Sequence, residues 1–274
     1  MRITGPSHKK DDVSTNDADP AADAGQSSAI AKAFTVLRIL RHSRTPMALT
    51  AIAKEVGVAP SSAHAILGHL LAQGAVVQQR DKRYSLGPQL FYLGAAVATR
   101  APAYRSLWIE LVHAANDLGV TAAVAVAWDD HHLVLNSHNA GATDVTIPFG
   151  GLVPLAASSW GKVYFGWSGH DLPAALIRYT GRSITDHTRF RDEIDLARAR
   201  GYATDEGEYF EGVGGVCAPV TSVEGYEGLA SFVAPLDVVA RLGTDVLGRR
   251  LALLASRASL TLGDGERVQS FGRT

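Results

Sequence analysis

Ser159, Lys162 and Cys217 are the residues whose types suggest covalent catalysis. Ser159 and Lys162 have the S-x-x-K spacing that places a nucleophilic serine one helical turn from a lysine in penicillin-interacting enzymes. The Ser-Asp-Asn and Lys-Thr-Gly segments of those enzymes do not follow in this chain. Cys217 lies in an apolar run, where a lone cysteine is usually a small packing residue. We therefore expect no catalytic residues and no enzyme activity.

Metal and cofactor chemistry is the second possibility that the residue types raise. Adjacent strand residues point to opposite faces, so only one of His131 and His132 could share a face with His138. For these histidines, the pattern favours a surface hairpin over a metal site. For the acidic turn after residue 204, it favours exposed, solvated charges over a cation site. The glycines of residues 212–215 lack the strand-to-helix context of a dinucleotide loop, so no cofactor is expected.

The charges of the chain are distributed unevenly. The whole sequence has 26 Lys and Arg against 27 Asp and Glu, yet residues 27–100 hold nine basic and two acidic residues, and residues 101–274 hold 14 basic and 20 acidic ones. A basic module joined to an acidic one predicts a polyanion-binding unit beside a second unit of different function. On charge alone, a solvated basic face remains the alternative.

Three segments of the basic region have apolar residues at helical spacing. They run from Ile30 to Leu40, from Leu49 to Val56 and from Pro60 to Leu71, and a short turn containing Gly57 separates the last two. Two short helices joined in this way are typical of a helix-turn-helix, whose second helix lies in the DNA major groove. The residues predicted to face the DNA from this second helix are Ser61, Ser62 and His64.

A β-hairpin with a basic tip is predicted directly after these helices. Residues 75–79 and 84–86 have strand character and flank Arg80, Asp81, Lys82 and Arg83. Such a wing can place Arg80, Lys82 and Arg83 beside the DNA backbone or in the minor groove, where charge supplies affinity and little sequence information. Residues 27–86 therefore indicate a winged helix-turn-helix that binds double-stranded DNA.

The rest of the chain is long enough for a second core. Of the 274 residues 46% are apolar, the single cysteine excludes a disulfide framework, and no apolar run approaches the roughly 20 residues of a membrane span. We expect a cytoplasmic protein without membrane contact. Strand-like segments alternate with helical ones, which favours an α+β unit. The segments with strand character are 120–128, 132–136, 213–221 and 229–234, and those with helical character are 107–118, 156–167, 189–200 and a long final helix from about residue 236.

Several motifs together resemble the IclR family of bacterial transcriptional regulators. They are Ala33–Leu40, Leu49–Ala53, Gly57–His64, Tyr84–Gly87, the Pro-Leu segment Pro154–Lys162, Gly201–Ala203, the acidic turn Asp205–Glu208, and Cys217–Val220. The resemblance implies a winged helix-turn-helix, a linker helix and a GAF/PAS-like α/β domain that binds small effectors. We predict a disordered arm (1–26), a DNA-binding domain (27–86), a linker helix (87–103), an effector-binding domain (104–262) and a C-terminal tail (263–274).

The resemblance also implies a position for the effector pocket and a set of partners. By motif register the pocket residues are Val145, Val153, Ser159, Trp160, Asp205, Gly215, Phe232 and Ala234, with Cys217 close by. Relatives that bind small carboxylates tend to have serines near Phe232 and Ala234, so we expect an aromatic or more apolar effector here, or a filled pocket without a ligand. The family implies a homodimer or a dimer of dimers on a palindromic operator, with RNA polymerase as a further candidate partner.

Overall fold

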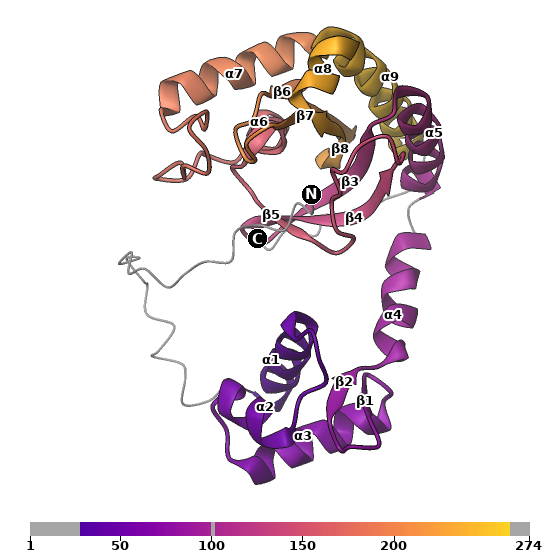
Figure 1. Cartoon of the computed structure of the whole chain (residues 1–274), viewed down its shortest axis with the longest axis vertical. Helices are drawn as coiled ribbons and strands as arrows, with labels where there is room; N and C mark the ends of the chain where they lie inside the picture. The colour runs from indigo at the N-terminus through magenta and orange to yellow at the C-terminus, as the bar shows by residue number, and fades with distance from the viewer. Residues whose placement is uncertain (1–27, 100–101, 264–274) are drawn as a thin grey trace. The chain divides into compact units, whose positions relative to one another are not determined.

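The computed structural model describes residues 28–99 and 102–263, and the predicted arm and most of the predicted tail lie outside these ranges. The described residues form two compact units, one ending at Thr99 and the other starting at Pro102 (Figure 1). Among the described residues, none of the helices has the length and apolarity that a membrane crossing requires.

The first unit consists of three helices, a short hairpin and a fourth helix. Its elements are α1 (Ala29–His42), α2 (Leu49–Val56), α3 (Pro60–Ala72), β1 (Val76–Gln78), β2 (Tyr84–Leu86) and α4 (Pro88–Thr99). Gly57 ends α2 in the left-handed conformation, with φ of 75°, and Pro60 occupies the first turn of α3. These two residues make the tight turn of the helix-turn-helix that the sequence predicts.

The core of the first unit lies among the three helices and the hairpin. It is formed by Val36, Leu40, Ile52, Leu67, Val76 and Tyr84. The apolar spacing predicted for α1 is confirmed at Leu40, which is buried, but it fails near the start of the helix, where Ile30 is 71% exposed and Phe34 is 62% exposed. Helical spacing identified the helix, and its buried residues are Val36 and Leu40.

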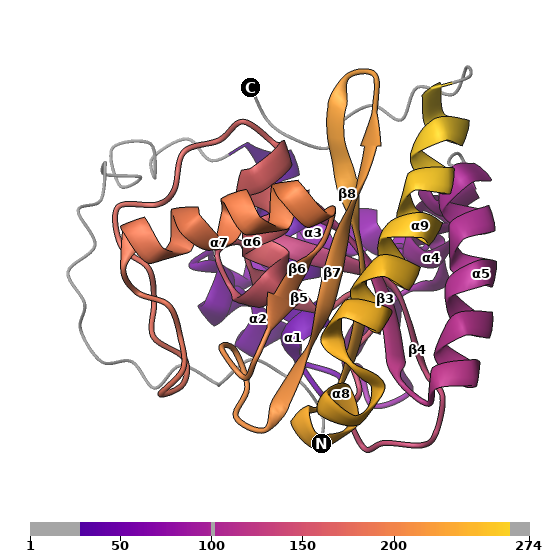
Figure 2. The same ribbon diagram turned by 90° about the horizontal axis from the view of Figure 1, so that it is seen from above.

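The second unit is a six-stranded antiparallel sheet with helices on both faces (Figure 2). The strand order is β5-β4-β3-β8-β7-β6. In chain order the elements are α5 (Pro102–Leu118), β3 (Thr121–Trp128), β4 (His131–Asn139), β5 (Leu152–Pro154), α6 (Ser158–Trp167), α7 (His187–Arg200), β6 (Ala203–Asp205), β7 (Val213–Ser222), β8 (Gly225–Pro235), α8 (Leu236–Leu242) and α9 (Thr244–Gly263).

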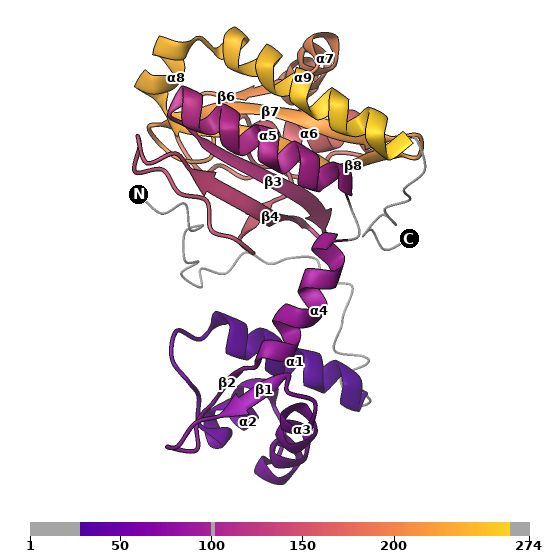
Figure 3. The ribbon, with the colours of Figure 1, turned by 90° about the vertical axis from the view of Figure 1, so that its right-hand side faces the viewer.

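Two apolar layers cover the two faces of this sheet. Helices α5 and α9 run side by side over one face (Figure 3), where Leu111, Val216, Phe232 and Leu251 are buried together. Helix α6, backed by α7, covers the other face with a separate buried cluster that includes Trp160 and Cys217. Each central strand is thus buried on both sides, and alternate residues of one strand belong to different layers.

The second unit differs from the sequence prediction in two places. The predicted final helix is divided into α8 and α9 at Gly243, whose φ of 84° ends α8. Strands β5 and β6 were not predicted, because three residues are too few to show a periodic pattern.

Candidate functional site

The outer face of α3 carries small and polar residues, because the apolar residues of this helix face the core of the first unit. Ala63 and Leu67 are buried, which turns Ser61, Ser62 and His64 to solvent. The residue before the helix, Ala59, supplies no side-chain cap to the first-turn N–H groups. A helix start with exposed hydroxyls and uncapped N–H groups suits phosphate oxygens and base edges.

The wing presents its basic residues unequally. The guanidinium of Arg83 pairs with Asp81, with 3.4 Å between Nε and Oδ2, and also donates to the carbonyl of Pro46 at 3.4 Å. Arg80 and Lys82 are exposed, and neither has an ion pair among the described residues. Lys82 has a φ of 62° in the tight turn that closes the hairpin. Arg80 and Lys82 are therefore the cations that the wing leaves for a polyanion.

The second unit contains a hollow at the start of α6. The space inside it that a water-sized molecule can occupy is about 30 Å³, and the hollow is partly open to solvent. The hollow lies where α6, the acidic turn and the ends of β7 and β8 meet. Its lining residues are Ile147, Val153, Ser158, Ser159, Trp160, Asp205, Tyr209, Phe210, Val213, Gly215 and Val233. Five of these, namely Val153, Ser159, Trp160, Asp205 and Gly215, are residues that the motif register placed in the effector pocket.

Two of the predicted pocket residues lie on the wrong face of the sheet for this hollow. Phe232 and Ala234 are buried in the layer under α5 and α9, whereas Val233 between them lines the hollow. Side chains alternate along a strand, so a register error of one residue moves the whole set to the opposite face. Ser231 shares the face of Val233, and its hydroxyl is buried without a hydrogen-bond partner in the described structure. A serine near this position is therefore present, contrary to the expectation.

Two further predicted pocket residues do not line the hollow, and four residues that do line it were not predicted. Val145 and Cys217 are buried nearby but do not line the hollow, and burial raises the pKa of the Cys217 thiol. Ile147, Tyr209, Phe210 and Val213 line it and were not predicted. They lie in loops and at a strand end, where apolar periodicity is absent, although two adjacent aromatic residues after an acidic turn were a usable indication.

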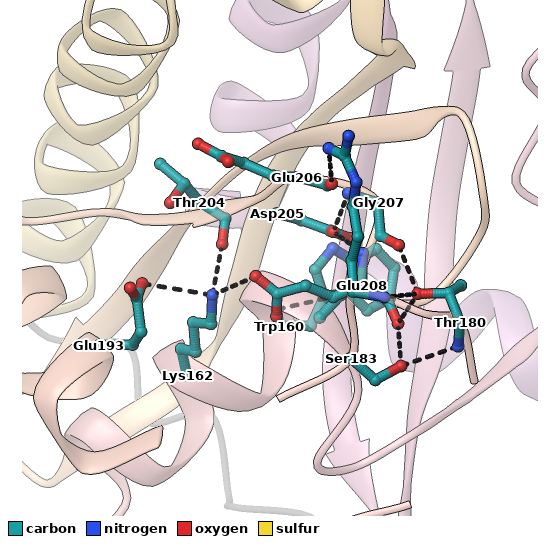
Figure 4. Close-up of polar contacts among 12 residues, drawn as sticks. Trp160, Lys162, Thr180, Ser183, Glu193, Thr204, Asp205, Glu206, Gly207 and Glu208 are labelled. Atoms are coloured by element: carbon teal, nitrogen blue, oxygen red, sulfur yellow. Dashed lines mark hydrogen bonds and ion pairs between the residues drawn. The ribbon is translucent and has the colours of Figure 1, made fainter. Parts of the chain in front are cut away.

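Lys162 connects α6 to α7 and to the acidic turn beside the hollow. It is 1% exposed, and its ammonium group donates to Glu208 Oε1 at 2.6 Å, to the carbonyl of Thr204 at 2.8 Å and to Glu193 Oε2 at 3.4 Å (Figure 4). The three N–H groups of the ammonium group are thus all used in hydrogen bonds to Glu208, Thr204 and Glu193. The arrangement therefore gives no support to Lys162 as a base for Ser159.

Asp205 is the acidic group of the hollow. Its Oδ1 accepts backbone hydrogen bonds from Gly207 at 2.9 Å and from Glu208 at 2.7 Å, which fixes the turn (Figure 4). Burial, and then the neighbouring charge of Glu208, raise the pKa of Asp205 to about 7. Burial also raises the pKa of Glu208, although Lys162 acts in the opposite direction. The acidic turn is thus partly buried rather than fully solvated as expected.

The three histidines do not assemble into a metal site among the described residues. His131 pairs with Asp130, and His138 Nε2 lies 2.8 Å from Asn116 Oδ1. His132 was expected on a surface hairpin, which is wrong, because α6 covers this strand and buries the ring completely against Trp160 and Tyr164. Burial lowers the pKa of His132 to about 3.

Comparisons with known proteins place both units in one family. Residues 29–80 match the IclR helix-turn-helix domain, and residues 110–252 match the bacterial transcriptional regulator IclR C-terminal domain. The glycerol operon regulatory protein of Streptomyces griseus is 31% identical over 199 residues, 69% of this chain and 77% of that protein. The acetate operon repressor of Salmonella typhimurium is 23% identical over 69% of this chain and 73% of its own length.

Solved structures show the same fold. An IclR transcriptional regulator from Alicyclobacillus acidocaldarius superimposes with a TM-score of 0.74 at 27% identity, covering 87% of this chain and 100% of that one. An IclR homolog from Microbacterium hydrocarbonoxydans, complexed with 4-hydroxybenzoate, has a TM-score of 0.72 at 19% identity, covering 85% of this chain and 100% of that one. The α+β architecture, with a helix-turn-helix followed by a curled antiparallel sheet, is therefore that of these regulators.

Proposed function

The chain belongs to the IclR family of DNA-binding transcriptional regulators, and on this premise we propose that a small organic effector, bound in the hollow of its second unit, changes how its first unit binds an operator. The observation that carries the proposal is the hollow itself, which is lined by apolar and aromatic side chains around a few polar groups. This is the usual composition of a small-molecule site.

DNA contact is assigned to the outer face of α3 and to the wing. Ser61, Ser62 and His64 are proposed to contact bases and phosphates, and Arg80 and Lys82 to contact the backbone, with Arg83 contributing less because Asp81 pairs with it. A homodimer or a dimer of dimers on a palindromic operator is part of the proposal, because two-fold symmetric proteins bind two-fold symmetric sites.

An aromatic or otherwise apolar effector fits the lining better than a small aliphatic keto acid. The hollow has three aromatic residues, Trp160, Tyr209 and Phe210, and none of its described lining residues is Lys, Arg or His. A carboxylate buried there would lose its hydration without a basic side chain to compensate. A solved IclR homolog of this fold is complexed with 4-hydroxybenzoate, an aromatic ring that also carries a carboxylate, so that protein supports the aromatic body of the ligand and not the exclusion of an anionic group.

The test measures whether a ligand of the second unit changes DNA binding by the first unit. Genomic fragments retained by the purified full-length protein would supply an operator, and fluorescence anisotropy on that operator would then be repeated with panels of aromatic compounds and keto acids. We expect an aromatic compound to change the Kd for the operator and to leave binding to random DNA unchanged. A change produced selectively by a small aliphatic keto acid would contradict the ligand class.

The alternative role for the second unit is assembly alone, with Trp160 filling the pocket. The exposed fraction of Trp160 is 4%, so its indole already occupies much of the space at the start of α6. If no compound changes operator binding while the protein remains an oligomer on DNA, this second role is supported.

A further inference from the structure

We propose that the hollow selects an organic cation, namely a small amine with an aromatic or branched apolar body, whose ammonium group pairs with the carboxylate of Asp205. The proposal rests on the effector-binding function proposed above and names the chemical class of the ligand. It depends on three features of the described structure: the charges of the lining, the hydrogen bonds of Asp205 and the aromatic residues around it.

The charged side chains that line the hollow have one sign only. Asp205 is the single acidic residue among the described lining residues, and none of them is basic. The nearest buried cation, Lys162, is held by Glu208, Glu193 and the carbonyl of Thr204, so two carboxylates already share its charge. Asp205 therefore has a negative neighbour in Glu208 and no ion pair among the described residues, although the charge of Lys162 partly offsets that of Glu208. A ligand ammonium would supply the missing charge.

The carboxylate of Asp205 is already positioned for such a partner. The backbone N–H groups of Gly207 and Glu208 both donate to Oδ1. The turn thus orients the carboxylate through one oxygen, and Oδ2 accepts no hydrogen bond from the residues that the structure describes. The pKa of this group in the protein is raised to about 7, because burial and Glu208 disfavour its charged form. A bound cation favours that charged form, so binding and ionisation of Asp205 support each other.

The aromatic residues suit the rest of a cationic ligand. Trp160, Tyr209 and Phe210 line the hollow with Asp205, and the rings of Tyr209 and Phe210 pack edge to face with centroids 4.5 Å apart. The face of an aromatic ring is negative and attracts a cation, while its apolar surface accepts a hydrocarbon body. One carboxylate among three aromatic residues therefore favours an amine over a neutral ligand of the same shape.

An anionic ligand is the competing class, because α6 begins at Ser158 on the rim of the hollow. The positive end of the helix dipole attracts anions. An anion there would lie in the same hollow as Asp205, however, and would have no basic lining residue as a partner. Repulsion between the two carboxylates opposes its binding whenever Asp205 is ionised.

The experiment compares three probes of one shape and different charge. Benzylamine, benzyl alcohol and benzoate are titrated into the full-length protein by isothermal calorimetry at about pH 8, where Asp205 is ionised. We expect benzylamine to bind at least about tenfold more tightly than benzyl alcohol, which is the effect of one charge-assisted hydrogen bond, and benzoate to bind most weakly.

Two variants assign the preference to one side chain. Asp205→Asn keeps an oxygen that accepts from Gly207 and Glu208, and it should remove the preference for benzylamine while benzyl alcohol still binds. Glu206→Gln removes a charge from the same turn at an exposed residue outside the hollow, and the preference should remain. Thermal unfolding of both variants without ligand verifies that the turn is intact.

The possible results separate this inference from the function on which it rests. Equal binding of benzylamine and benzyl alcohol, or tighter binding of benzoate, would overturn the cation while leaving a ligand-binding pocket in place. Failure of all three probes to bind at millimolar concentration would also overturn it. The effector function itself would fail only if, in addition, no compound of the larger panels changed operator binding.

Discussion

Lys162 and Glu208 form a buried ion pair, with 2.6 Å between Nζ and Oε1, that joins α6 to the acidic turn. Ser159 and Trp160 precede Lys162 on α6, and Tyr209 follows Glu208, so the pair positions residues from two walls of the same hollow. A sequence separation of 46 residues lies between the partners. The hollow therefore depends on a charge interaction that does not itself line it.

Replacing Lys162 by methionine should destabilise the protein strongly. The substitution keeps most of the side-chain length but leaves Glu208 and Glu193 partly buried without their cation. Removal of one partner of a buried ion pair typically costs about 3–5 kcal/mol, because the other charge remains desolvated. Urea denaturation followed by circular dichroism measures this loss in the free energy of unfolding.

An exposed ion pair provides the matched control for Lys162. Arg249 lies 3.9 Å from Asp245 on α9, and both side chains are about 70% exposed. Arg249→Ala should change the free energy of unfolding by less than about 1 kcal/mol, since exposed pairs contribute little. Comparable losses in the two variants would show that burial of Lys162 has no special role.

Stability should fall as the pH rises from about 4 to about 7, in part because of Asp205. The pKa of this group is raised from 3.8 to about 7 in the folded protein, so within that window the folded state binds the proton that the unfolded state has released. The free energy of unfolding decreases wherever the folded state holds more protons, and the decrease is complete above the folded pKa.

Asp205→Asn isolates this contribution from the other titrating groups. Glu208 has its pKa raised in the same direction and Lys162 opposes the shift at both residues, so the wild-type slope is a sum. Between pH 5 and pH 8, the free energy of unfolding of the variant should fall by on the order of 1–2 kcal/mol less than that of the wild type. This figure allows for screening of the charge by solvent in the open part of the hollow. Identical slopes would contradict a raised pKa at Asp205.

Most helices of the protein could be predicted from the sequence, because the amphipathic spacing agrees with the residues that begin and end helices. Gly57 and Pro60 mark the turn of the helix-turn-helix, and both have the conformations that their residue types favour. The outer face of α3 follows directly, since burial of Ala63 and Leu67 leaves Ser62 and His64 exposed. Local rules were sufficient here because the unit is small and its contacts are mostly between neighbouring elements.

The hollow was only partly predictable because it is built from distant segments. The motif register gave Asp205 and Gly215 but assigned Phe232 to the pocket, and in a strand buried on both faces apolar residues alone do not show which face each one occupies. The burial of His132 was missed for a related reason. Whether α6 covers a given strand is a tertiary property, and a histidine on a short hairpin has the same local sequence in either case.

The wing should contribute to DNA affinity through two cations rather than three. Arg80→Ala combined with Lys82→Ala should weaken binding to operator and random DNA alike, and should lower the slope of log Kd against log salt concentration by roughly 2, because each lost phosphate contact removes about 0.9. Arg83→Ala should lower that slope by less than about 1, since Asp81 already pairs with Arg83. Anisotropy titrations at several salt concentrations measure both slopes, and a larger effect from Arg83 would reverse the assignment.

Phe232 and Val233 should affect different properties, although they are neighbours in β8. Phe232→Leu changes packing under α5 and α9 and should cost roughly 1 kcal/mol in the free energy of unfolding without altering probe affinity. Val233→Thr is nearly isosteric and adds a hydroxyl to the lining of the hollow, so it should change the affinity for benzyl alcohol by about 2- to 10-fold through one hydrogen bond. Calorimetric titration and urea denaturation of both variants separate the two effects. The opposite result, with ligand affinity sensitive to Phe232 and indifferent to Val233, would mean that the ligand binds on the α5–α9 face of the sheet.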